Sequence, residues 1–309
     1  MRVAVTGAGG RLGNALIGAL AAASFTGPSG PLAWGRTDFD LDAPNAIGAL
    51  LDTSRAELVI HAAAWTDVDG CARDPQLALR RNGTATGILA AAAAARNVDL
   101  IFISTNEVFD GTQRGRPYRP DDPTAPANPY GASKLAGERA ALDAYASRAG
   151  DARGTGDRRG GLGIARTAWL FGAGAPDFPV KIAQAAKRAI DAGQALRVVG
   201  DEIGTPTYVA DVAAAVVELI GAKAVSGMHH LVNGGVASRA AWARDVLDRL
   251  EIPAEIVEIV QTEYPRASQP PRWGVLAPTP LPGGELIRPW TEAMADYVPA
   301  LRRSVTVGR

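Results

Sequence analysis

The chain opens with a short apolar run that passes directly into three evenly spaced glycines. Residues 2–6 are mostly β-branched or small, Gly7, Gly10 and Gly13 follow, and residues 11–23 have the composition of a helix. A strand that turns tightly into a helix is typical of the first βαβ unit of a parallel sheet. The first glycine permits the turn, and the third lets the helix pack close to the strand. This opening predicts an α/β fold.

The alternation of strands and helices continues through the first half of the chain. Short runs rich in valine, isoleucine and leucine alternate with longer segments rich in alanine and leucine, which favours a Rossmann-type doubly wound parallel sheet. The predicted strands are 31–34, 57–61, 98–104 and 162–168, and the predicted helices are 44–53, 75–96 and 128–147.

The second half has shorter strands and more proline. We expect a dinucleotide-binding domain at 1–171 and, at 172–309, a smaller interleaved substrate lobe with some elements that return to the sheet. Glycines and mixed charges at 148–161 indicate a mobile surface loop, and the prolines of 264–282 indicate an extended segment. The predicted helices here are 178–192, 209–222, 238–250 and 288–302, and the predicted strands are 195–199 and 228–232.

Composition excludes several functional classes. Of 309 residues, 47% are hydrophobic and 21% are charged, which is ordinary for a globular protein. The net charge of +0 offers no overall positive field for nucleic acid or an anionic membrane. No apolar stretch approaches the ~20 residues of a membrane helix, and the single cysteine, Cys71, rules out an internal disulfide. We expect a cytoplasmic protein that binds a small molecule, with no nucleic-acid or membrane partner.

The glycine turn also suits a phosphate group. Its exposed backbone amides and the positive end of the next helix attract an anion such as a pyrophosphate. After the second strand, a carboxylate would bind a ribose hydroxyl, whereas an arginine would pair with a 2′-phosphate. Arg36 stands there, so NADP(H) is favoured over NAD(H), unless Arg36 is only a solvated surface arginine. The expected cofactor residues so far are Gly7, Gly10, Arg11, Leu12, Gly13, Arg36 and the small residues Ala62, Ala63 and Ala64.

Tyr130 and Lys134 form a Tyr-x-x-x-Lys pair in a predicted helix. This spacing places both side chains on one helix face. A neighbouring ammonium favours phenolate and so lowers the pKa of the phenol, which makes tyrosine a usable proton donor or acceptor near neutrality. Lys134 would also hold the nicotinamide ribose. The alternative is a tyrosine packed in the core beside a solvated lysine.

Polar residues follow the fourth predicted strand, beginning with Ser104, Thr105 and Asn106. The carboxyl ends of parallel strands are where ligands bind in open α/β sheets. A hydroxyl such as that of Thr105 can donate a hydrogen bond to a substrate oxygen whose charge changes during hydride transfer.

Together these motifs resemble the extended short-chain dehydrogenase/reductases and, within them, the dTDP-4-dehydrorhamnose reductase family. The likeness runs over nearly the whole chain. The segments that carry it are Thr6–Gly13, Ala62–Asp69, Ser104–Asn106, Pro129–Glu138, Arg166–Gly172, Gly204–Tyr208 and Leu286–Trp290.

The resemblance implies NAD(P)H-dependent reduction of the 4-keto group of a dTDP-4-dehydro-6-deoxyhexose, a nucleotide-sugar substrate. It implies catalytic roles for Thr105, Tyr130 and Lys134, with Tyr130 and Lys134 also at the cofactor. Asp40 and Leu41 would flank the adenine. The residues that would bind substrate are Thr66, Thr105, Asn106, Glu107 and Trp169.

A departure from the family pattern keeps other functions open. The family usually has Asp-Tyr where this chain has Asn106-Glu107. Related 4,6-dehydratases have Thr-Asp-Glu there and need an acid to protonate the departing hydroxyl, a proton that an amide cannot supply. Reduction is therefore the first hypothesis, and a dehydratase or epimerase is the second. A third is a non-catalytic regulatory subunit, since the chain is also similar to the regulatory subunits of methionine adenosyltransferase.

We expect no metal site and leave a homodimer open. Some family members carry a carboxylate after the glycine turn that helps to bind Mg²⁺ between subunits, but Asn14 and Ala15 occupy that region here. The histidines His61, His229 and His230 do not have metal-ligand spacing.

Overall fold

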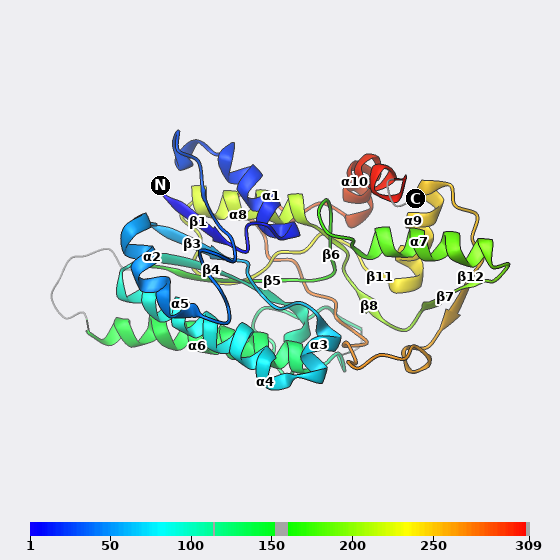
Figure 1. The fold of residues 1–309 in the computed structure, drawn as a ribbon, viewed down its shortest axis with the longest axis horizontal. Coiled ribbons are helices and arrows are strands. Elements are labelled where there is room, and N and C mark those ends of the chain that lie inside the picture. The colour runs from blue at the N-terminus through cyan, green and yellow to red at the C-terminus, as the bar shows by residue number, and fades with distance from the viewer. Residues whose placement is uncertain (114, 152–159, 307–309) are drawn as a thin grey trace.

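The computed structural model describes residues 1–113, 115–151 and 160–306, and a parallel β-sheet lies at the centre of its larger part (Figure 1). The strand order is β10-β5-β4-β3-β1-β2, and every neighbouring pair is parallel. This confirms the predicted fold class. The six strands are β1 (Val3–Thr6), β2 (Leu32–Trp34), β3 (Leu58–His61), β4 (Asp99–Thr105), β5 (Leu162–Thr167) and β10 (Gly227–His230).

Helices cover both faces of the sheet because successive side chains of a strand point to opposite faces. Val3 and Val5 of β1 belong to the same core as α1 (Arg11–Ala21) and α8 (Val209–Gly221). Ala4, between them, packs in a second core on the other face. The helices on that face are α2 (Ile47–Ser54), which follows a 3₁₀ turn at Pro44–Ala46, α5 (Ala85–Ala95) and α6 (Pro129–Asp151).

The predicted helix 75–96 is helical throughout but irregular. It begins as α4 (Pro75–Ala78), continues as a π-helical turn at Leu79–Thr84, and ends as α5. The short helix α3 (Val68–Arg73) was not predicted, although Asp67 caps it by accepting a hydrogen bond from the Gly70 amide at 2.9 Å.

A smaller lobe has its own core beside the sheet (Figure 1). Phe171, Trp242, Met294 and Tyr297 are fully or almost fully buried in it. Its helices are α7 (Phe178–Asp191), α9 (Arg239–Leu250) and α10 (Trp290–Thr306), and its parallel strand pair is β7 (Leu196–Val199) with β12 (Ile256–Ile259).

Short strand pairs lie where the chain passes between the two parts. They are β6 (Leu170–Phe171) with β9 (Thr207–Tyr208), and β8 (Ile203–Gly204) with β11 (Ala237–Ser238). The proline-rich segment 264–282 follows a 3₁₀ turn at Gln261–Glu263. Its backbone pairs with Tyr118, whose amide donates to the Val275 carbonyl at 2.8 Å, and with Ile203, whose amide donates to the Arg272 carbonyl at 2.7 Å.

The predicted loop 148–161 is described only at its ends. Helix α6 extends to Asp151, beyond the predicted end at residue 147, and residues 152–159 lie outside the described residues. Within the described ranges, none of the helices has both the length and the apolar character required to span a bilayer.

Candidate active site

The glycine turn lies where the strand order reverses, between β1 and β3. Chain connections diverge at this point of an open α/β sheet and leave a crevice at the carboxyl ends of the strands. Gly7 has a φ of +66°, and a Cβ there would lie 2.8 Å from the Ala63 backbone. A Cβ on Gly13 would collide with the Gly7 carbonyl, which accepts a hydrogen bond from the Gly10 amide at 2.9 Å. Only glycines permit this close crossing.

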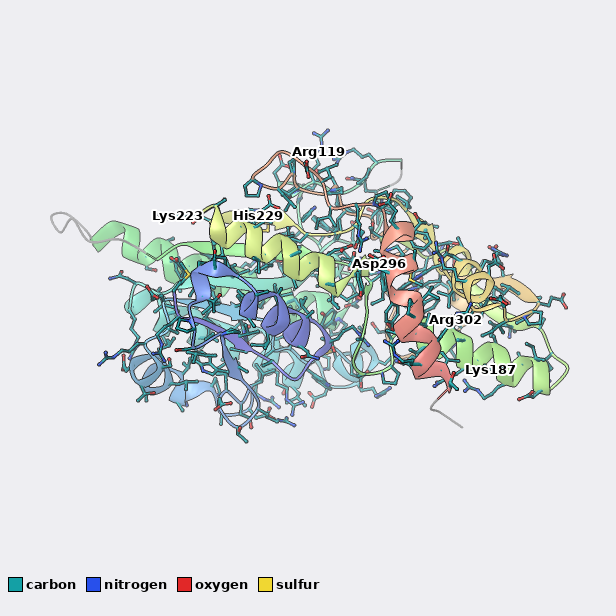
Figure 2. The ribbon with its side chains drawn as sticks, turned by 90° about the horizontal axis from the view of Figure 1, so that it is seen from above. Arg119, Lys187, Lys223, His229, Asp296 and Arg302 are labelled. Atoms are coloured by element: carbon teal, nitrogen blue, oxygen red, sulfur yellow. The ribbon has the colours of Figure 1, made fainter. Side chains whose placement is uncertain are left out.

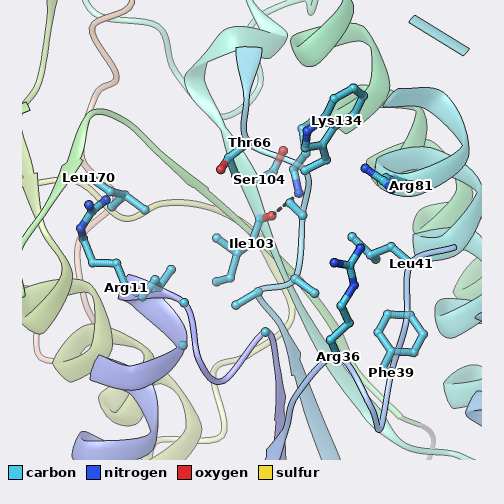
Figure 3. A pocket seen from close by; sticks show the side chains of 18 of the residues that line it. Arg11, Arg36, Phe39, Leu41, Thr66, Arg81, Ile103, Ser104, Lys134 and Leu170 are labelled. Carbon is cyan, nitrogen blue, oxygen red and sulfur yellow. Dashed lines mark hydrogen bonds between the residues drawn. The ribbon is translucent and has the colours of Figure 1, made fainter. Parts of the chain in front are cut away.

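A cavity of about 540 Å³ opens above this crossing (Figure 3). It brings together every residue expected at the cofactor: Gly7, Gly10, Arg11, Leu12, Gly13, Arg36, Asp40, Leu41, Ala62, Ala63, Ala64, Tyr130 and Lys134. Thr66, expected at the substrate, also lines it. The remaining lining residues were not predicted as site residues: Gly35, Phe39, Trp65, Arg81, Ile103, Ser104, Thr167, Leu170 and Ala175.

The start of helix α1 fits a pyrophosphate. No side chain caps the helix at Gly10, and its first turn carries no acidic residue. The first amides of a helix lack partners within the helix, and the helix dipole makes this end positive. An amide-rich, glycine-walled cradle of this kind is suited to the phosphates of a dinucleotide.

Two arginines stand at one side of the cavity, across from Arg11 and Leu170 (Figure 3). Arg36 has a side chain that is 75% exposed, and its guanidinium lies 3.6 Å from Asp42. Arg81 donates to both carboxylate oxygens of Asp42, at 2.6 and 2.7 Å, and this pairing lowers the pKa of Asp42. Arg81 also lies over the Trp65 ring at 5.2 Å. Arg81 lies in the π-helical turn Leu79–Thr84, so regular helical spacing did not predict that it faces the cavity.

Tyr130 and Lys134 lie on α6 and face the cavity. The Lys134 ammonium donates to the Ile103 carbonyl at 2.8 Å and lies 4.1 Å from the centre of the Phe102 ring. Lys134 is 2% exposed, so the alternative of a solvated lysine is wrong.

Burial sets the proton affinities of this pair. It lowers the pKa of Lys134 to about 7, while the Glu138 carboxylate acts in the opposite direction. Burial and the Glu107 carboxylate raise the pKa of Tyr130, and a hydrogen bond with Thr105 opposes them. The expected lowering of the phenol pKa is therefore wrong for this arrangement: the pKa of Tyr130 is raised, because the desolvation of the buried phenol dominates. Tyr130 holds its proton at neutral pH.

Thr105 occupies the last position of β4 and caps the 3₁₀ turn at Asn106–Val108. Its hydroxyl oxygen accepts from the Glu107 amide at 3.2 Å and donates to the Asn106 side-chain oxygen at 3.3 Å. The Thr105 hydroxyl also forms a hydrogen bond with Tyr130, so the three expected catalytic residues lie near one end of β4, although Thr105 does not line the cavity itself.

The proline-rich segment contacts this end of the sheet. The Asn106 amide donates to the Gly274 carbonyl at 3.1 Å, and the Asn128 amide donates to the Gln269 carbonyl at 3.2 Å. Asn128 also donates to Glu107 at 2.6 Å. Burial raises the pKa of Glu107 to about 6, and the Asn128 hydrogen bond opposes this rise. Asn106 and Glu107 do not line the cavity, and the role of Asn128 and of this segment was not predicted.

Trp169 stands at the junction with the smaller lobe. It has a φ of +43°, and a Cβ on Gly204 would lie 2.5 Å from its ring. The Arg239 guanidinium lies 3.6 Å from the Trp169 ring centre and donates to Glu202 at 2.9 Å. Arg239 and Glu202 also act electrostatically on Glu107. Trp169 does not line the cavity itself, and the contribution of Arg239 was not predicted.

Asn82 is a further residue that the sequence analysis missed. It is 1% exposed and joins the chain after β3 to α6. Its side chain accepts from the Trp65 amide at 2.8 Å and donates to the Trp65 carbonyl and the Ser133 hydroxyl, both at 3.0 Å. The cavity wall after β3 is thereby held beside the helix that carries Tyr130.

Comparison with known proteins gives a consistent result. Residues 1–303 match the family model described as the RmlD substrate binding domain. A dTDP-4-dehydrorhamnose reductase of Mycolicibacterium smegmatis is 34% identical, over 99% of this chain and 88% of the relative. The dTDP-4-dehydrorhamnose reductase of Streptomyces griseus is 34% identical, over 96% of this chain and 93% of the relative.

Solved structures agree. The dTDP-4-dehydrorhamnose reductase of Clostridium acetobutylicum is 28% identical with a TM-score of 0.85, covering 98% of this chain and 100% of the other. The Bacillus anthracis reductase, solved in complex with NADP, is 26% identical with a TM-score of 0.83, covering 97% and 99%. The chain belongs to the family of the RmlD substrate binding domain.

Proposed function

We propose that this protein is an NAD(P)H-dependent reductase of the 4-keto group of a dTDP-4-dehydro-6-deoxyhexose, in deoxysugar nucleotide biosynthesis. Its family membership and the names of its relatives support the reductase activity and the nucleotide-sugar substrate. One observation of the structure carries the proposal: Tyr130 and Lys134 line one end of a cavity whose other walls suit a dinucleotide, and Thr105 lies behind them, hydrogen-bonded to Tyr130.

A bound nicotinamide supplies the hydride, and this chain supplies the proton and the geometry. When C4 receives a hydride, its carbonyl oxygen gains negative charge and must take up a proton. Tyr130 donates that proton, because burial keeps its phenol protonated. The Thr105 hydroxyl is placed beside the phenol and donates a hydrogen bond to the same oxygen.

Lys134 stabilises the Tyr130 phenolate that forms when the proton is transferred. Loss of the proton leaves a phenolate on Tyr130, and an ammonium on the same helix face favours that anion. The fixed contact with the Ile103 carbonyl holds the ammonium in place beside the cavity. Lys134 therefore contributes most in the transition state, when the phenolate forms.

We propose that NADPH is preferred over NADH. Arg36 follows β2, where a 2′-phosphate on the adenosine ribose would lie, and Arg81 stands on the same side of the cavity. Guanidinium groups pair with phosphate through charge-assisted hydrogen bonds. Asp42 forms a bidentate pair with Arg81, so Arg81 is oriented before a phosphate arrives, while the exposed Arg36 side chain can turn toward it.

The other two hypotheses gain less support. A dehydratase needs an acid at position 106, but this side chain is an amide that binds the Gly274 carbonyl. A non-catalytic subunit has no need for a tyrosine and a lysine that line the cofactor cavity, with a threonine hydrogen-bonded to the tyrosine.

A ketosugar assay tests the proposal. Purified protein is mixed with NADPH or NADH and with dTDP-4-dehydrorhamnose or dTDP-4-keto-6-deoxyglucose, and oxidation of the reduced nicotinamide is followed. We expect turnover only with a ketosugar, faster with NADPH, and a loss of at least about 100-fold in Tyr130→Phe. Cofactor binding without turnover of any ketosugar would favour the regulatory alternative. Water loss from dTDP-glucose would favour the dehydratase.

A further inference from the structure

A buried carboxylate links β5 to the two elements that carry the proposed catalytic residues, β4 and α6. Glu138 of α6 accepts a hydrogen bond from the Ser104 hydroxyl at 2.5 Å. The Arg166 guanidinium donates to both carboxylate oxygens of Glu138, at 3.0 and 2.7 Å. The Arg166 and Glu138 side chains are 4% and 2% exposed. Solvent therefore does not screen this network.

Each member of the network adjoins a residue of the cavity. Glu138 lies one helical turn after Lys134, and Ser104 follows Ile103 and lines the cavity itself. Arg166 directly precedes Thr167, whose hydroxyl donates to the Ser104 carbonyl at 3.2 Å. In the sheet, Ser104 of β4 pairs with Arg166 of β5. One carboxylate thus fixes α6 to the ends of both strands.

The surroundings of Lys134 show why a nearby negative charge matters. On β3, burial and Lys134 itself lower the pKa of His61 to about 3, so this imidazole is neutral. On β4, Lys134 meets only the Ile103 carbonyl and the Phe102 ring. On its own helix it has the neutral phenol of Tyr130 and the Glu138 carboxylate, which raises the pKa of Lys134.

The remaining charged groups near this end of the cavity partly offset one another. Arg166 of β5 carries the cation that pairs with Glu138, and so weakens the field of Glu138 at Lys134. Glu107, after β4, acts on the Tyr130 phenol and is bound by Asn128.

We propose that Glu138 is a positioning residue of this reductase: clamped by Arg166 and Ser104, it holds α6 against β4 and β5 and sets a negative charge one helical turn from Lys134. The inference rests on the proposed function for its catalytic consequence. The effect of Glu138 on Lys134 is a property of the protein alone and can be tested without any cofactor or substrate.

Opposite substitutions give opposite shifts. Glu138→Gln removes the negative charge and leaves the Arg166 cation, so the pKa of Lys134 falls further below its ordinary value. Arg166→Gln removes the competing cation, so the pKa of Lys134 rises. The double variant removes both charges and returns the pKa toward that of the wild type. A general loosening of the site would not produce shifts of opposite sign.

The lysine composition makes the measurement direct. The chain has four lysines, and Lys181, Lys187 and Lys223 are exposed. Figure 2 shows Lys187 and Lys223 at the periphery of different parts of the molecule. In protein labelled with ¹³C and ¹⁵N at lysine, NMR titration resolves one buried ammonium, and its absence from Lys134→Met assigns it.

Two further variants separate electrostatics from folding. Ser104→Ala removes one hydrogen bond but no charge, so we expect a folded protein with a smaller shift than Glu138→Gln. Asp211→Asn is the matched control, because Asp211 forms a bidentate pair with Arg288 and neither residue lines the cavity. Thermal denaturation should show lower stability for Asp211→Asn, with the Lys134 titration unchanged.

The proposal predicts that kcat follows the titration. In Glu138→Gln the alkaline loss of kcat moves to lower pH with the Lys134 midpoint, and Arg166→Lys, which keeps the charge, retains the wild-type profile. Shifts of the same sign in Glu138→Gln and Arg166→Gln, or no shift in either, would overturn the inference. If the titrations shift as expected but no ketosugar is reduced, the proposed function fails and the effect of Glu138 on Lys134 stands.

Discussion

Arg36 offers a sharp test of how the cavity recognises its cofactor. Replacing it with alanine removes one of two guanidinium groups on that side of the cavity and leaves the glycine turn untouched. The Arg36 side chain is 75% exposed and makes only long ion pairs, at 3.8 Å to Asp40 and 3.6 Å to Asp42. Arg36→Ala should therefore alter NADPH binding with little effect on folding.

The size of the expected loss in NADPH affinity follows from the exposure of the Arg36 side chain. A hydrogen bond to a charged group contributes about 1.5–3 kcal/mol. Solvent and salt screen an exposed arginine, so the lower end of about 1.5 kcal/mol applies, which is about tenfold in a dissociation constant. NADH has no 2′-phosphate, so its affinity should change by less than about twofold. Because solvent ions screen the interaction between Arg36 and the 2′-phosphate, raising the salt concentration should reduce the difference in NADPH affinity between the wild type and Arg36→Ala.

Fluorescence titration of the two reduced cofactors measures both affinities. The control is Arg197→Ala, because Arg197 lies in the smaller lobe, has a 60% exposed side chain and pairs with Glu263 at 3.0 Å. We expect the control to bind both cofactors as the wild type does. Equal losses of NADPH and NADH affinity in Arg36→Ala, or no loss of either, would refute the assignment of this side of the cavity to a 2′-phosphate.

Three further predictions concern the glycine turn and two of the proposed catalytic residues, Thr105 and Lys134. Gly13→Ala should weaken NADPH binding by more than about tenfold and lower the free energy of unfolding by about 1–3 kcal/mol, because the added methyl group collides with the Gly7 carbonyl. Fluorescence titration and thermal denaturation measure the two effects. Unchanged NADPH affinity would contradict the close crossing. Thr105→Val should lower kcat by about 10–100-fold with a smaller change in cofactor affinity, and an unchanged kcat would remove Thr105 from the mechanism. The pKa of Lys134 is lowered from 10.5 to about 7, so between these pH values the unfolded chain binds one proton more than the folded protein. The free energy of unfolding should therefore rise with pH across that range, while kcat falls. Lys134→Met should not show this rise in the free energy of unfolding.

The fold and the shared placement of Tyr130 and Lys134 on the cavity were accessible from sequence because both depend on local spacing. Apolar runs alternating with helical segments specify a parallel sheet, and three glycines after β1 specify the crossing at Ala63. A tyrosine and a lysine four residues apart lie on one helix face in any regular helix.

The site residues that were not predicted depend on contacts between residues far apart in the sequence, or on irregular helix geometry. Asn106 meets Gly274 across 168 positions of sequence, and Arg81 is presented by a π-helical turn instead of a regular helix. The proton affinity of Tyr130 was mispredicted for a related reason. Spacing identified its charged neighbour but not the depth of burial, and burial dominates.

The central claim is that Tyr130 gives a proton to the oxygen of a C4 carbonyl that receives a hydride in this cavity. The most direct measurement uses NADPH deuterated at its transferable position together with dTDP-4-dehydrorhamnose, and NMR of the product. The account predicts deuterium at C4 of the sugar, one NADPH oxidised for each ketosugar reduced, and almost no product with Tyr130→Phe. Deuterium at another carbon, or turnover by Tyr130→Phe at the wild-type rate, would contradict it.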